Sequence, residues 1–103
     1  MSAPVLTSAP HDREFAEAVS ALQTGRLVDA ERLCKAVLRA EPKHVDALNL
    51  LGVVLDRLGR NMEALASFDR ALVVAPNSDE SWYGRGMMLL AMNDPSLVTG
   101  HWL

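Results

Sequence analysis

The chain has 103 residues, of which 50% are hydrophobic and 22% charged, so it has the composition of an ordinary globular protein and the length of one small domain. Its 10 basic and 13 acidic residues give a net charge of −3 with both signs interspersed, which argues against nucleic acid or a membrane surface as a partner. The lone Cys34 excludes an internal disulfide, and the absence of a secretory-signal pattern in the first ten residues and of a long apolar run favours a cytoplasmic location.

Apolar residues at helical spacing predict five helices joined by short turns. Residues 1–10 contain two prolines and no periodicity, so we expect them to be disordered. The helices are predicted over residues 12–24, 27–41, 45–58, 61–75 and 79–92. Gly25 and Gly59 follow the first and third helices, where a left-handed residue ends a helix without a Cβ clash. Pro42 and Pro76 follow the second and fourth, where proline stops the helix.

The same pattern returns after 34 residues. Pairs that stand 34 residues apart include Gly25 and Gly59, Ala30 and Ala64, Pro42 and Pro76, and Gly52 and Gly86. The units are residues 11–44, 45–78 and a partial third unit at 79–93, followed by a tail at 94–103. A repeat of this length with helical patterning predicts an all-α fold, an α-solenoid of antiparallel helix hairpins about two and a half units long.

Small residues are expected where the two helices of a hairpin cross. Gly52 and Ala64 stand at that crossing in the second unit, and Phe68 and Leu72 are predicted to fill the space beyond it. Cys34 occupies the position of Phe68 in the preceding unit, so we interpret it as a buried packing thiol rather than a reactive one.

These recurring positions resemble the tetratricopeptide repeat family. The second unit carries the resemblance best, with Leu48, Leu51, Gly52, Leu55, Gly59, Ala64, Phe68, Ala71, Leu72 and Pro76 on the family's pattern positions. The third unit supplies "WYGRGMML", whereas the first is degenerate, with Glu14 where the family favours tryptophan. The resemblance implies a noncatalytic scaffold for protein–protein interaction, which binds a partner in a concave groove lined by the first helix of each pair.

Groove positions follow from the same resemblance. They are Asp12, Phe15, Val19, Leu22, Gln23, Asn49, Val53, Asp56, Arg57, Glu80, Tyr83, Met87 and Leu90. The best-known subgroup of the family clamps a C-terminal carboxylate with basic and amide side chains, but this chain has Phe15, Val19, Leu50, Glu80 and Gly84 at the matching positions. The groove is therefore expected to suit an apolar or amphipathic helix, or an extended segment, rather than an acidic tail.

The third unit departs from the pattern, because Pro95 stands where its second helix should begin. This leaves an apolar end, and one explanation is that it supports self-association as a homodimer through Met88, Met92, Val98, Trp102 and Leu103. Two alternatives stay open: the tail folds back as a cap, or the chain is a fragment of a longer protein. The array also resembles the amino-terminal parts of larger bacterial proteins, so the alternative function is recruitment for an enzyme such as a glycosyltransferase.

Chemistry-bearing residues are sparse. His11, His44 and His101 have no metal-ligand spacing, and no nucleophile, base and orienting acid stand in a recognisable set. We therefore expect no enzymatic activity, no metal and no cofactor.

Overall fold

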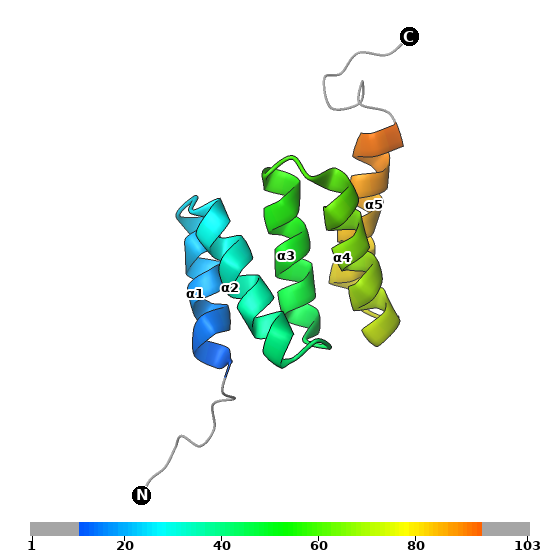
Figure 1. Ribbon diagram of the computed structural model, residues 1–103. Coiled ribbons are helices and arrows are strands. Elements are labelled where there is room, and N and C mark those ends of the chain that lie inside the picture. Colours follow the sequence, from blue (N-terminus) through cyan, green and yellow to red (C-terminus); the bar gives the residue numbers. More distant parts are fainter. Residues whose placement is uncertain (1–10, 94–103) are drawn as a thin grey trace, which may run out of the picture.

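The computed structural model describes residues 11–93, which form five α-helices (Figure 1). They are α1 (Asp12–Gln23), α2 (Leu27–Ala40), α3 (Val45–Arg57), α4 (Asn61–Val74) and α5 (Asp79–Asn93). Every predicted helix is confirmed, and each end lies within one residue of its predicted place. The segment 1–10 and the tail 94–103, both named in the sequence predictions, lie outside the described residues.

The helices pair as two hairpins followed by a single helix. α1 packs against α2, α3 packs against α4, and α5 packs against α4. α3 also contacts α1 on one side and α5 on the other, so the first helices of successive units form one layer. This layering confirms the all-α repeat architecture and brings side chains from all three units onto one face.

Both glycine turns have the predicted conformation. Gly25 and Gly59 have φ values of 78° and 82°, in the left-handed region that an L side chain rarely adopts. The Gly59 N–H donates to the Asp56 carbonyl, and the Arg60 N–H donates to the Leu55 carbonyl at 2.9 Å. These two bonds satisfy carbonyls at the end of α3 and turn the chain into α4.

The prolines act through the residues before them. Glu41 and Ala75, which precede Pro42 and Pro76, have φ of −139° and −134° with ψ near 84° and 83°. Proline disfavours the helical region for its preceding residue, so α2 and α4 end at these extended residues.

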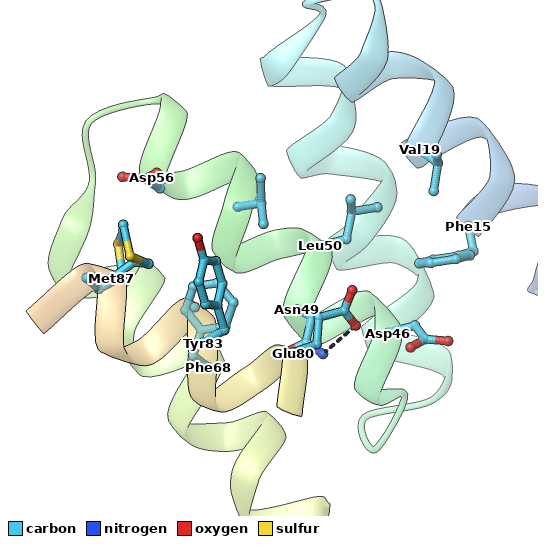
Figure 2. Close-up of a pocket in the computed structure, with 13 residues that line it drawn as sticks. Phe15, Val19, Asp46, Asn49, Leu50, Asp56, Phe68, Glu80, Tyr83 and Met87 are labelled. Atoms are coloured by element: carbon cyan, nitrogen blue, oxygen red, sulfur yellow. Dashed lines mark hydrogen bonds between the residues drawn. The ribbon is translucent and has the colours of Figure 1, made fainter. Parts of the chain in front are cut away.

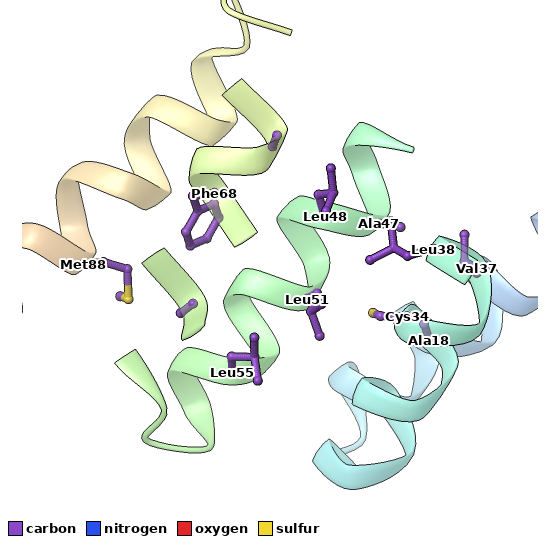
Figure 3. Packing of buried hydrophobic residues seen from close by; sticks show 12 residues of the cluster. Ala18, Cys34, Val37, Leu38, Ala47, Leu48, Leu51, Leu55, Phe68 and Met88 are labelled. Carbon is purple, nitrogen blue, oxygen red and sulfur yellow. The ribbon is translucent and has the colours of Figure 1, made fainter. Parts of the chain in front are cut away.

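The core runs between the two layers (Figure 3). Leu48, Val37 and Cys34 are among the largest fully buried side chains. The prediction for Cys34 is confirmed: burial raises the pKa of its thiol to about 12, so at neutral pH it is a protonated packing group rather than a nucleophile.

An ion-pair network joins the two hairpins at their surface. Arg60, which precedes α4, contacts Glu31 of α2 at 2.9 Å and Glu63 of α4 at 2.7 Å. Lys35 contacts Glu31 at 2.8 Å. Hydrogen bonds from Lys35 and then from Arg60 lower the pKa of the Glu31 carboxyl, and the hydrogen bond from Arg60 lowers that of Glu63.

This network predicts acid sensitivity. Glu31 and Glu63 bind a proton less readily in the folded state than at their ordinary pKa of 4.5, so the stability they contribute is present above that pH and lost as pH falls through their lower folded pKa values. We expect Arg60→Gln to make the free energy of unfolding fall less steeply below about pH 4.5 in urea titrations. Arg57→Gln, which removes an exposed arginine of α3, should leave the slope unchanged. Equal slopes in both variants would contradict the assignment.

Candidate functional site

A cavity of about 700 Å³ opens on the face formed by α1, α3 and α5 (Figure 2). We call it the groove. Its lining residues are Phe15, Val19, Asp46, Asn49, Leu50, Val53, Asp56, Phe68, Glu80, Tyr83, Gly84, Met87 and Met88. All three repeat units therefore contribute to one concave surface.

α4 contributes a single side chain to the groove, the ring of Phe68, which is only 3% exposed. A Cβ atom on Gly52 would lie 2.6 Å from a carbon of this ring, and a Cβ atom on Gly84 would lie closer still. Carbon atoms that are not bonded normally stay about 3.5–4.0 Å apart. The two glycines thus leave the space in which the ring reaches between α3 and α5 and closes the base of the groove.

The walls of the groove are mostly apolar. Phe15 and Val19 stand on α1, Val53 stands on α3, and Tyr83 and Met87 stand on α5 (Figure 2). The last two are exposed large hydrophobic residues, Tyr83 at 71%. The Phe15 ring is held from behind by the ring of His44, with a centroid distance of 5.1 Å. The groove consequently presents apolar side chains on α1 at one end and on α5 at the other. No helix among the described residues covers Tyr83, which stays exposed.

A buried polar network fixes α5 against α3. Ser81 is fully buried, and its hydroxyl donates to Asn49 Oδ1 at 2.7 Å, while Asn49 Nδ2 donates to Glu80 Oε1 at 3.4 Å. Ser78 precedes α5 and its hydroxyl accepts the Ser81 N–H at 3.2 Å, as a helix-capping residue does. Because Asn49 is 5% exposed and bonded at both ends of its amide, its role is to position the two helices.

The charged groups that line the groove are all acidic. Asp46 lies in the first turn of α3, Asp56 lies near the other end of that helix, and Glu80 lies in the first turn of α5. Neither lysine nor arginine lines the cavity. No ion pair joins any of the three carboxylates to another residue within 11–93.

The structure brings most of the predicted groove residues together. Those that line the groove are Phe15, Val19, Asn49, Val53, Asp56, Glu80, Tyr83 and Met87. Those that do not are Asp12, Leu22, Gln23, Arg57 and Leu90. Leu22 packs instead against the small cluster formed by Ala21, Ala30 and Val54.

Met88 requires a correction. It was predicted on an exposed self-association surface, but it is 6% exposed and belongs to the core cluster beside Phe68. Met92 packs against the same cluster and is half-buried. Val98, Trp102 and Leu103 lie outside the described residues. Met88 is therefore mainly a core residue, and the surface that it reaches is the lining of the groove.

Residues missed as groove members have different explanations. Asp46 carries a signal, since it shares one helical face with Asn49 and Val53 at spacings of three and seven residues. Phe68 had been assigned to packing alone, and its place at the base of the groove depends on where α5 lies. That position was not available from helical periodicity.

Residues 11–93 offer no candidate for two other kinds of site. That part of the chain has no group of three or more His, Cys, Asp or Glu side chains placed to hold a metal ion. None of its helices combines the length and the apolar character that crossing a membrane requires.

Comparison with known families supports this description. The model of a family described as tetratricopeptide repeat matches residues 15–79 and 54–96, so the matched region spans most of the 103 residues. Repeats of this family generally mediate protein–protein interaction and are generally noncatalytic. The chain belongs to the tetratricopeptide repeat family.

Proposed function

We propose that the protein is a noncatalytic interaction module and that its groove binds an apolar or amphipathic segment of a partner protein. One observation carries the proposal: Tyr83 and Met87 are exposed on α5 and face the apolar side chains of α1 and α3 across the cavity. When a partner covers large apolar side chains on a concave surface and removes them from water, the free energy of the complex falls.

The chemistry of the anchors supports a protein segment as the ligand. Tyrosine gives a large contact area with few rotatable bonds and is enriched among residues that dominate binding energy. Methionine is flexible and polarisable, so Met87 can adjust to partner side chains of different shape. Val53 lines the same cavity from α3 and adds a β-branched apolar side chain with few rotamers.

The charge distribution favours an apolar segment over an acidic tail. Binding a terminal carboxylate in a groove of this kind needs cationic or amide donors aimed at it. The one lining amide, that of Asn49, is already bonded to Ser81 and Glu80. The remaining polar side chains at the cavity are carboxylates and a phenol, and carboxylates repel an anion.

The test replaces groove residues by lysine and measures binding of peptides selected on the wild-type protein from a displayed random library. We expect the double variant Val53→Lys, Met87→Lys to weaken binding by about tenfold or more. Two ammonium groups would then stand in the apolar centre of the groove and would have to be desolvated when the partner binds. The matched control is Val28→Lys with Met62→Lys, which changes the same residue types at exposed positions that do not line the groove. Equal affinity for the groove variant and the control would refute the proposal.

A further inference from the structure

We infer that the segment bound in the groove carries lysine or arginine on both sides of its apolar centre. The inference rests on the proposed function of the groove and adds the charge pattern of its partner. The observation behind it is the arrangement of Asp46, Asp56 and Glu80 around apolar walls, with no cationic side chain lining the cavity.

The carboxylates stand at two ends of the groove. Asp46 and Asp56 are ten residues apart on α3, which places them about 15 Å apart along the helix axis. Glu80 lies close to the Asp46 end, and Asp56 lies near Met87 at the other (Figure 2). The apolar stretch between these ends is formed by Leu50 and Val53. A complementary segment therefore has an apolar centre about 15 Å long with a cation at each end.

These carboxylates are available to a ligand. Asp46, Asp56 and Glu80 are exposed, and Glu80 makes only the long hydrogen bond from Asn49 among the bonds found within residues 11–93. Arg85, which is on the same helix as Glu80, is held by Asp69 of α4 at 2.6 Å. Charges of one sign on the rim of an apolar surface act mainly by attracting a partner of the opposite sign and by rejecting one of the same sign.

The net charge of the chain acts in the same direction. At −3, the protein as a whole attracts a cationic segment, and the three groove carboxylates concentrate that attraction at one face. Because the carboxylates are exposed, salt should screen them, whereas apolar contact in the centre of the groove should survive. The salt dependence of binding thus separates the two contributions.

The experiment selects displayed random peptides of about sixteen residues, long enough to span about 15 Å as a helix with flanks. Peptides are kept if they bind the wild-type protein and fail to bind the Val53→Lys, Met87→Lys variant. We expect lysine and arginine to be enriched over aspartate and glutamate on both sides of the apolar residues.

The retained peptides are then titrated against a triple variant that carries Asp46→Asn, Asp56→Asn and Glu80→Gln together. Binding should weaken by about tenfold at low salt and by less at high salt. The charge-matched control, Glu14→Gln, Glu17→Gln, Glu41→Gln, alters residues that do not line the groove and should stay within about twofold. Far-UV circular dichroism of both variants reports that the helices are retained.

Two results would overturn the inference. Groove-dependent peptides without cationic enrichment, or with affinities that the groove triple variant leaves unchanged, would refute the charge pattern while the proposed function stands. A library that yields no groove-dependent peptide would refute the proposed function, and the inference would fall with it.

Discussion

Replacing Phe68 by alanine is expected to lower the free energy of unfolding by about 3–5 kcal/mol. The ring is 3% exposed, belongs to the core cluster and fills the space between α3 and α5. Its removal takes away apolar burial and leaves a cavity that the helices, fixed by Asn49 and Ser81, cannot close easily. Urea unfolding followed by circular dichroism measures the loss.

One glycine opposite the ring and one away from it provide the control for this explanation. Gly52→Ala should destabilise the protein by about 1–3 kcal/mol because the added methyl group overlaps Phe68. Gly86 lies in α5, and a Cβ atom there would meet no described atom within 4 Å apart from its chain neighbours and the backbone of its own helix. Gly86→Ala should therefore stabilise the helix by about 0.5–1 kcal/mol. Combining Gly52→Ala with Phe68→Leu should cost less than the sum of the two changes. A stabilising Gly52→Ala would show that the ring does not occupy this space.

Removal of the Ser81 hydroxyl is expected to cost about 1–3 kcal/mol, a large effect for one oxygen atom. Asn49 Oδ1 accepts its 2.7 Å hydrogen bond from that hydroxyl in a site from which water is excluded, so Ser81→Ala leaves a buried acceptor without this donor. Ser20→Ala changes an exposed serine of α1 and should have little effect.

A double substitution separates the hydrogen bond from general packing. Replacing Asn49 by leucine together with Ser81→Ala removes donor and acceptor at once, so the pair should be less destabilised than the sum of the single variants. Additive losses in urea unfolding would mean that the two side chains are not coupled. They would also mean that the Ser81–Asn49 hydrogen bond does not hold α5 in position against α3.

Most of the helical architecture is readable from local sequence signals. Gly59 fixes the end of α3 because few other residues adopt its positive φ, and Pro76 fixes the end of α4 through Ala75. These constraints act on the residue itself or on its neighbour, so they need no knowledge of distant packing. The 34-residue spacing then places equivalent helices in one layer.

The details of α5 are less accessible to sequence reasoning. Apolar side chains such as Trp82, Met87, Met88 and Leu90 point around most of this helix, so periodicity does not establish which of them faces the core. Met88 is buried and Met87 lines the groove in part because the Phe68 ring sets how α5 lies on α4. This dependence on a contact between units is also why Met88 was placed on a self-association surface although it is buried.

The proposed function assigns partner binding to the face formed by α1, α3 and α5. The most direct test is to map amide chemical-shift changes in two-dimensional NMR spectra as a groove-selected peptide is added. The largest changes are expected at Val53, Tyr83 and Met87, and small changes at the exposed Val28 of α2 and Met62 of α4. Largest changes on α2 and α4, with the groove residues unmoved, would contradict it.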